Sequence, residues 1–179
     1  MIVIVVIGAI IFIIIFIFSS KTLSPIPYFP SQKSDIPLIV KSFNLKNDQI
    51  VFDLGAGDGV VIFQAAERSF QKGLNTKFVA VEINPILILI MYFRRLFHKN
   101  KSNIKILKAD IFKFKIPLSK NSQTIYLYIS PWFIEKVLEI NKRLIKNNTI
   151  VSYMYPIKSL KKYEIEIKGK KSIFIYKSV

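Results

Sequence analysis

Short apolar runs alternate along this chain with longer segments in which apolar residues recur at helical spacing. The short runs predict strands at residues 51–54, 78–82, 104–107, 124–129 and 149–155. The longer segments predict helices at residues 60–70, 85–97 and about 133–145. Strands and helices in alternation pack as an α/β sandwich around a mostly parallel sheet, so we predict a Rossmann-like fold.

The pattern changes at both ends of this region. Residues 163–167 and 172–176 are strand-like, and the Lys-Gly-Lys-Lys sequence between them predicts a C-terminal antiparallel hairpin. Residues 156–162 leave room for only a short helix before it. On the other side, residues 34–43 predict a short helix with Ser34 as its cap.

Residues 1–18 are apolar and carry no charged side chain. At 1.5 Å per residue they can cross a hydrocarbon core of about 30 Å, so we predict a single-pass transmembrane anchor rather than a buried core helix. Lys21 and Lys33 follow the segment, and the positive-inside rule then predicts that the domain faces the cytoplasm. Residues 19–33 contain three prolines and predict a linker, which leaves residues 34–179 for the domain.

A glycine turn follows the first predicted strand. Asp53 ends the apolar run, and Gly55, Gly57 and Gly59 come directly after it. Glycines at a strand-to-helix turn let a ligand approach the backbone and the open N-terminus of the next helix, so the turn predicts a nucleotide-type site. The spacing fits neither the dinucleotide-binding fingerprint nor the phosphate loop. Glu82 ends the second predicted strand, where such folds place an acid that binds ribose hydroxyls.

Composition narrows the chemistry. The chain has no cysteine, which excludes thiolate sites, and its single histidine, His98, is not placed to serve a zinc site or a histidine-dependent triad, so we expect no bound metal. His98 is expected to be a solvated residue near a helix end. The formal net charge of +16 predicts an anionic partner, either a membrane surface or nucleic acid. The predicted anchor favours the membrane, and an abundance of Lys, Ile and Asn explains part of the charge as compositional drift.

The acid and glycine turn resembles motif I of class I S-adenosylmethionine-dependent methyltransferases. This resemblance implies that Asp53 and the turn hold the methionine part of S-adenosylmethionine, that Glu82 holds the ribose, and that Asp110 and Ile111 hold the adenine. The cofactor-binding residues implied by the resemblance are Asp53, Gly55, Ala56, Gly57, Asp58, Gly59, Glu82, Asn84, Asp110 and Ile111.

A closer resemblance is to the membrane-anchored protein-lysine methyltransferases. It rests on five segments in order, namely Pro-Tyr-Phe-Pro-Ser at 27–31, the glycine turn, Val-Glu-Ile-Asn-Pro at 81–85, Asp-Ile-Phe at 110–112 and Tyr-Leu-Tyr at 126–128. The resemblance implies methyl transfer to a lysine of a membrane-associated protein. Two departures concern the substrate: Val60 replaces an expected arginine, and Ser130, Pro131 and Trp132 replace Leu-Pro-acid.

Aromatic residues predict a channel for the acceptor, with Tyr28, Tyr128, Ser130, Pro131 and Trp132 as the candidate substrate residues, and Phe29, Tyr153 and Tyr155 beside them. An apolar channel favours the neutral form of a lysine amine by desolvation. Two alternatives remain. Ser130-Pro131-Trp132 loosely resembles the motif of methyltransferases that act on exocyclic or amide nitrogens, which would make nucleic acid the substrate. The chain could also be a non-catalytic membrane-bound module that keeps the fold.

Overall fold

The computed structural model describes residues 4–9, 12, 24, 26–145 and 148–177. Most of the predicted anchor at residues 1–18, and the first part of the predicted linker, lie outside these residues. Within the described part, no helix combines the length and the apolar composition needed to span a bilayer. The anchor, the linker and their boundaries therefore stay predictions.

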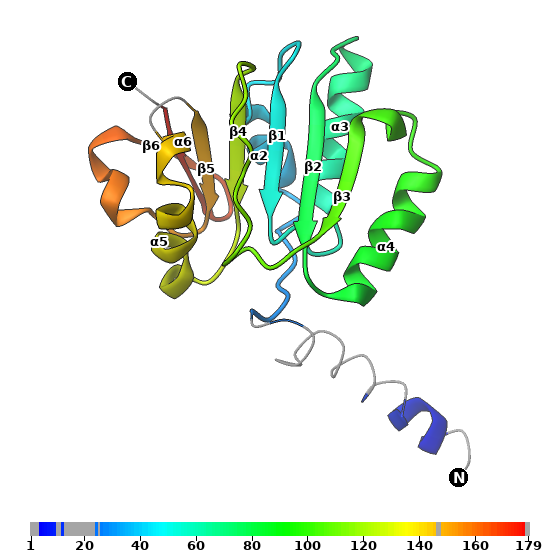
Figure 1. Ribbon diagram of the computed structural model, residues 1–179. Coiled ribbons are helices and arrows are strands. Elements are labelled where there is room, and N and C mark those ends of the chain that lie inside the picture. Colours follow the sequence, from blue (N-terminus) through cyan, green and yellow to red (C-terminus); the bar gives the residue numbers. More distant parts are fainter. Residues whose placement is uncertain (1–3, 10–11, 13–23, 25, 146–147, 178–179) are drawn as a thin grey trace.

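A seven-stranded mixed sheet in the order β3-β2-β1-β4-β5-β7-β6 forms the centre of the described part (Figure 1). Its first five strands run parallel and β7 alone is reversed, since it pairs antiparallel with both β5 and β6. The strands are β1 (Ile50–Leu54), β2 (Lys77–Glu82), β3 (Ile104–Lys108), β4 (Gln123–Leu127), β5 (Thr149–Tyr153), β6 (Glu164–Lys168) and β7 (Ser172–Tyr176). The predicted α/β sandwich with a C-terminal hairpin is confirmed.

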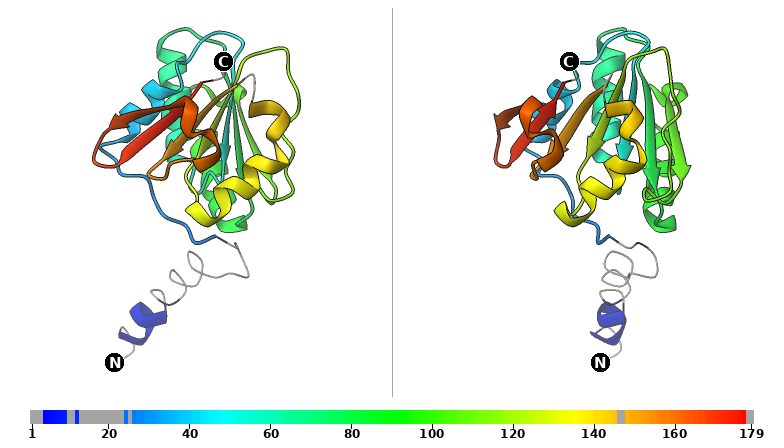
Figure 2. Two further views of the ribbon diagram at one scale, coloured as in Figure 1. Left: turned by 90° about the vertical axis from the view of Figure 1, so that its left-hand side faces the viewer. Right: turned by 60° about the vertical axis from the view of Figure 1, so that its left-hand side comes forward.

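Helices cover both faces of the sheet (Figure 2). On one face lie α2 (Ile36–Ser42), α3 (Val60–Gln71) and α4 (Pro85–Leu96). On the other lie α5 (Pro131–Ile140) and α6 (Lys142–Ile145), with the 3₁₀ helix η2 (Lys158–Tyr163) beside the hairpin. A second 3₁₀ turn, η1 (Lys101–Asn103), precedes β3. The α2 helix begins after Asp35, one residue later than the predicted cap at Ser34.

The helix predicted over residues 133–145 begins at Pro131 and is divided at Asn141. The side chain of Asn141 is buried, and its Oδ1 accepts the N–H of Ile116 at 2.9 Å. Its Nδ2 donates to the carbonyl oxygens of Phe114 at 3.3 Å and Val137 at 3.1 Å. These bonds attach the long connection between β3 and β4 to the end of α5, and helical periodicity alone does not encode them.

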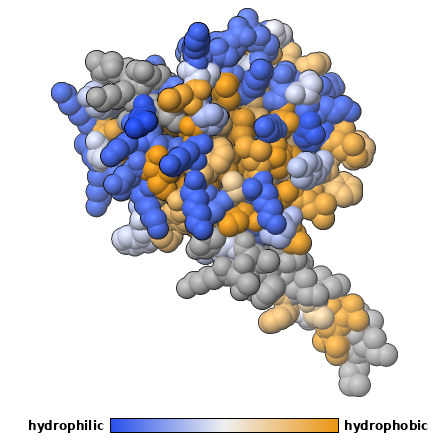
Figure 3. Space-filling view, in the orientation of Figure 1, coloured by the Kyte–Doolittle hydropathy of each residue, from blue (hydrophilic) through white to orange (hydrophobic). Residues whose placement is uncertain are grey.

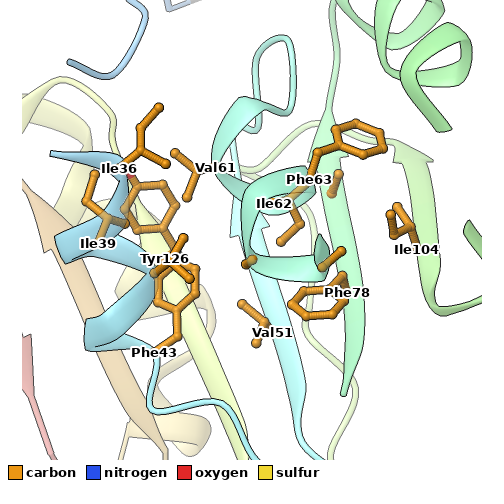
Figure 4. Close-up of a cluster of buried hydrophobic side chains, with 14 of the residues drawn as sticks. Ile36, Ile39, Phe43, Val51, Val61, Ile62, Phe63, Phe78, Ile104 and Tyr126 are labelled. Atoms are coloured by element: carbon orange, nitrogen blue, oxygen red, sulfur yellow. The ribbon is translucent and has the colours of Figure 1, made fainter. Parts of the chain in front are cut away.

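Strand alternation separates the core into two halves. Val51 and Asp53 point toward α3, whereas Phe52 and Leu54 point toward α5. Figure 4 shows Val51 among the buried side chains of α2, α3 and the neighbouring strands. The same alternation places Glu82 of β2 and Tyr126 of β4 on the Asp53 side, because Asp53 pairs in register with Ala80 and with Tyr126. The functional side chains therefore share one face of the sheet.

Asp35 joins the start of α2 to the C-terminal hairpin. Its carboxylate is 1% exposed, and it accepts hydrogen bonds from the Tyr153 hydroxyl at 2.7 Å and from the N–H groups of Lys170 at 2.7 Å and Lys171 at 2.9 Å. Burial would raise the pKa of Asp35, but the hydrogen bonds outweigh burial and lower it below the ordinary value. The ionised carboxylate thus stabilises the fold.

We predict that Asp35→Asn lowers the free energy of unfolding by about 3 kcal/mol at pH 7, since the amide cannot accept all three bonds. Because the folded pKa is depressed, the contribution is present above the unfolded pKa of about 3.9 and is lost as pH falls through the folded pKa. Urea denaturation at pH 7 and pH 3 checks this, and the gap between wild type and variant should shrink at pH 3. Tyr153→Phe, which removes a single bond, should cost about 1–2 kcal/mol. An equal gap at both pH values would contradict the ionised state of Asp35.

Candidate active site

A cavity lies at the carboxyl ends of the central parallel strands, where the strand order reverses between β1 and β4. Open α/β sheets bind ligands at this position. The empty space measures about 720 Å³, open solvent at the mouth included. Its walls come from Ser24 and residues 26–31 of the N-terminal segment, from the glycine turn, and from the ends of β2, β3 and β4.

The glycine turn has the backbone conformation that requires glycine. Gly57 has φ +60° and Gly59 has φ +76°, both in the left-handed region. A Cβ at Gly57 would lie 2.6 Å from the ring of Tyr28, so Tyr28 packs directly on the turn. A Cβ at Gly59 would instead meet Met91 of α4 and Phe63 of α3. Gly57 therefore faces the cavity, and Gly59 allows the two helices to pack closely.

Glu82 connects the glycine turn to the next helix. Its carboxylate is 5% exposed, and Oε2 accepts the N–H of Gly57 at 2.8 Å. Oε1 accepts the N–H groups of Ile83 at 2.8 Å and Asn84 at 2.9 Å. From the sequence alone, Glu82 is predicted only to bind the ribose of a cofactor. The structure adds a second role, because this carboxylate fixes the shape of the turn that surrounds it.

Asn84 lies outside the cavity lining. Its Oδ1 accepts the N–H groups of Ile86 at 2.9 Å and Leu87 at 3.4 Å, which caps the N-terminus of α4. The capping explains why an asparagine stands between the acid of β2 and the proline that begins the helix. A direct contact between Asn84 and a cofactor stays a prediction.

Asp53 is a buried carboxyl group that faces the cavity. It is 2% exposed, and no residue in the described part of the chain donates a hydrogen bond to its side chain. Burial raises the pKa of Asp53 well above the ordinary value, and the negative charges of Glu82 and Asp58 raise it further. Such a group is stabilised by a cation that enters the cavity.

Asp58 is neutralised from outside the cavity. Nη2 of Arg94 lies 2.6 Å from Asp58 Oδ2, and Oδ1 accepts the N–H of Val60 at 3.2 Å. Burial, the charge of Asp58 and a hydrogen bond to Asp58 raise the pKa of Tyr28. Position 60, where the resemblance leads one to expect an arginine, holds Val60, which lines the cavity. The arginine that contacts the glycine turn is instead Arg94 of α4.

Three tyrosines form the aromatic wall of the cavity, and sequence reasoning selected only Tyr28 and Tyr128. Tyr126 is fully buried beside Asp53, and its hydroxyl lies 3.4 Å from Ser31 Oγ of the N-terminal segment. Tyr128 packs edge-on against Tyr153 at 4.9 Å between ring centroids. The alternation of β4 could have identified Tyr126, since Tyr126 and Tyr128 must lie on the same face of the sheet.

The remaining candidates divide into two groups. Asp110 and Ile111 line the cavity, and Asp110 Oδ1 also accepts the N–H of Phe112 at 2.9 Å. Ser130 and Pro131 begin α5, and neither they nor Trp132 belong to the cavity lining. Trp132 is 84% exposed. The assignment of these residues to cofactor and substrate stays a prediction.

His98 packs inside the protein, so the expectation of a solvated residue is wrong. Its side chain is 13% exposed, Nε2 lies 3.1 Å from the carbonyl oxygen of Phe63, and Nδ1 accepts the N–H of Asn100 at 3.0 Å. These bonds attach the end of α4 to α3. His98 has a structural role away from the cavity.

Comparison with solved structures identifies the fold. An RNA methyltransferase from Salinibacter ruber, solved with S-adenosyl-L-homocysteine, superposes with a TM-score of 0.64 at 18% identity over 83% of this chain and 92% of its own. The 23S rRNA methyltransferase ErmE gives 0.59 at 14% identity over 85% and 70%. TrmK of M. capricolum, solved with S-adenosyl-homocysteine, gives 0.55 at 17% identity over 81% and 67%. No protein-family profile and no curated protein sequence matches the chain.

These similarities show the class I methyltransferase fold. At identities below one fifth they show the fold alone, and they leave the substrate undetermined. The predicted fold is supported, whereas the methyltransferase activity and the membrane-anchored lysine-methylating subtype stay proposals.

We predict that Gly57→Ala costs at least about 2 kcal/mol of stability, since the new Cβ adds a clash with Tyr28 to the backbone strain.

Gly73→Ala is the matched control. Gly73 has φ +65° and no atom within 4 Å of the point where a Cβ would lie, so this change should cost only about 1 kcal/mol. Thermal unfolding measures both. Adding Tyr28→Ala should return the cost of Gly57→Ala to that of Gly73→Ala. Equal costs for the two single variants would mean that Tyr28 does not pack on the turn.

Proposed function

We propose that the chain is an S-adenosylmethionine-dependent methyltransferase. The observation that carries the proposal is the buried Asp53 carboxyl group, which accepts no hydrogen bond within the described part of the chain and faces a cavity with the glycine turn and Glu82 at its wall. A cationic ligand that also presents hydroxyl groups would satisfy both acids. The methyltransferase fold and the solved neighbours with bound S-adenosylhomocysteine support this choice of ligand.

The residues present fit this cofactor. Asp53 would accept the ammonium group of the methionine part, close to the N–H groups of the glycine turn. Glu82 would accept ribose hydroxyls, because an ionised carboxylate has about four acceptor sites and the three backbone bonds leave one available. Asp110 and Ile111 would border the adenine. The sulfonium of the bound cofactor supplies an electrophilic methyl group, so the chain need only orient the acceptor and exclude water.

We propose a lysine of a membrane-associated protein as the acceptor. The cavity contains Asp53, Asp58, Glu82 and Asp110, four of the eleven acidic residues of the chain, and within the described part no lysine or arginine lines it. An acidic cavity lining in a protein with a net charge of +16 disfavours phosphates. The rings of Tyr28 and Tyr128 favour the neutral, nucleophilic form of a lysine by desolvation.

The alternative acceptor is a base of nucleic acid. Trp132 favours it, because an indole that is 84% exposed beside the end of β4 could stack on a base. Two of the solved neighbours are named as RNA methyltransferases, and the surface of this chain is basic. The acids inside the cavity oppose the alternative.

Methyl transfer by the full-length protein in vesicles tests the proposal. With labelled S-adenosylmethionine, a membrane fraction and total RNA as acceptors, we expect label in protein lysines after acid hydrolysis. Asp53→Asn should abolish the label, and Asp48→Asn, at an exposed turn, should retain it. Label in RNA would favour the alternative. No label with either acceptor, together with no cofactor binding, would favour the non-catalytic module.

We predict that the affinity for S-adenosylmethionine rises with pH up to the pKa of Asp53 in the free protein. Burial and the nearby acids raise that pKa, a cationic ligand lowers it, and between the two values binding releases a proton. Calorimetry in buffers of different ionisation enthalpy measures the release. Asp53→Asn should bind at least about tenfold more weakly and lose the pH dependence, whereas Asp48→Asn should keep both. Affinity that is flat with pH in the wild type would contradict a protonated Asp53.

A further inference from the structure

The α4 helix is apolar on two opposite faces. Its inner face packs Leu87, Ile88 and Met91 into the core. Its outer face consists of large side chains at helical spacing that are 50% to 80% exposed, and we call these five residues the outer α4 face: Leu89, Tyr92, Phe93, Leu96 and Phe97. The spacing i, i+3, i+4, i+7, i+8 places them on one stripe. In the described part of the chain no other element packs on this stripe.

Single exposed apolar residues are common, but a continuous row of five on one helix is not. Figure 3 shows apolar residues along the right-hand edge of the molecule, where α4 lies in Figure 1. The α4 helix contacts β2 and β3 on its inner side, and β3 is the edge strand of the sheet. The outer α4 face therefore points away from the protein, which marks it as a surface for association.

The charged side chains that α4 and the residues directly after it carry are all basic. Residues 85–103 contain no acidic residue, and Arg94, Arg95, Lys99 and Lys101 lie among or directly after the exposed apolar side chains. Arg95 Nε donates to the carbonyl oxygens of Lys101 at 3.1 Å and Ile104 at 2.7 Å, while Lys99 and Lys101 are exposed. Aromatic and aliphatic residues bordered by lysine and arginine are typical of helices that lie in the interface of an anionic bilayer.

We propose that the outer α4 face lies on the surface of an anionic lipid bilayer. Charge complementarity selects this occupant over a second copy of the chain, because pairing two copies would bring surfaces of like charge together. The α4 helix begins three residues after Glu82, and Arg94 binds Asp58 of the glycine turn. Docking through this face thus holds the cavity beside the membrane. Membrane docking of this kind does not depend on the proposed methyl transfer.

Quenching of tryptophan fluorescence by brominated lipid tests the contact. The full-length protein is placed in vesicles of phosphatidylcholine and phosphatidylglycerol, and Phe93→Trp is introduced in a Trp132→Phe background. The control reporter is Ile165→Trp, at a residue that is 49% exposed on β6, the opposite edge of the sheet. We expect lipid brominated near the headgroup to quench most of the emission of the Phe93→Trp variant and little of the emission of the Ile165→Trp variant. Equal quenching of the two reporters would overturn the proposal.

The charge requirement is tested in the same assay. Lys99→Glu with Lys101→Glu should reduce the quenching of the Phe93→Trp reporter to its level in phosphatidylcholine alone. Lys162→Glu with Lys168→Glu, two exposed positions next to or on β6, changes the net charge equally and should leave the quenching unchanged. Equal effects of the two pairs would overturn the charge argument. The chain has no cysteine, so efficient disulfide cross-linking of Phe93→Cys between two copies would assign the face to a dimer and overturn the proposal.

Discussion

The structure of the site depends on how three buried or partly buried carboxyl groups are kept close together. Like charges at the carboxyl edge of one sheet repel each other, and each acid needs its own compensation. Glu82 receives three backbone N–H groups and Asp58 receives Arg94, whereas Asp53 receives no donor within the described chain. The bonds of Glu82 and Asp58 fix the shape of the glycine turn and the start of α4, and with them the surface on which Tyr28 packs. The uncompensated one gives the cavity its preference for a cation.

The N-terminal segment before α2 forms part of the cavity wall, and it does not only connect the predicted anchor to the domain. Tyr28 packs on Gly57, Ser31 lies within hydrogen-bonding distance of Tyr126, and Asp35 fixes the following residues to the hairpin. A segment held at three points closes one side of the cavity with a stiff, proline-flanked wall. The sequence boundary between linker and domain is therefore not a functional boundary. Movement of this segment would change access to the cavity and the position of the Tyr28 ring together.

Periodicity and turn chemistry predicted most of the fold and part of the site. The strands, the order of elements, the hairpin and the glycine turn follow from local patterns, and the side of the sheet that carries Asp53 follows from alternation. What could not be predicted depends on contacts between distant residues. Asn141 breaks a periodic helix because it binds a connection 25 residues away, and Arg94 reaches a turn 36 residues earlier. The exposure of the outer α4 face could not be predicted either, because a strongly apolar helix predicts burial on every side.

The distribution of charge connects the cavity to the surface. A basic composition that came only from drift would place lysines without regard to the cavity, yet the cavity lining holds four acids and, in the described part, no basic residue. The region from 85 to 103, in contrast, holds basic residues and no acid. The two neighbouring surfaces therefore attract different groups. A basic exterior is attracted to anionic headgroups, and an acidic cavity lining selects cationic groups. Under the proposed function, such an enzyme would meet an amine acceptor at the bilayer surface, because its basic exterior repels a soluble lysine-rich protein.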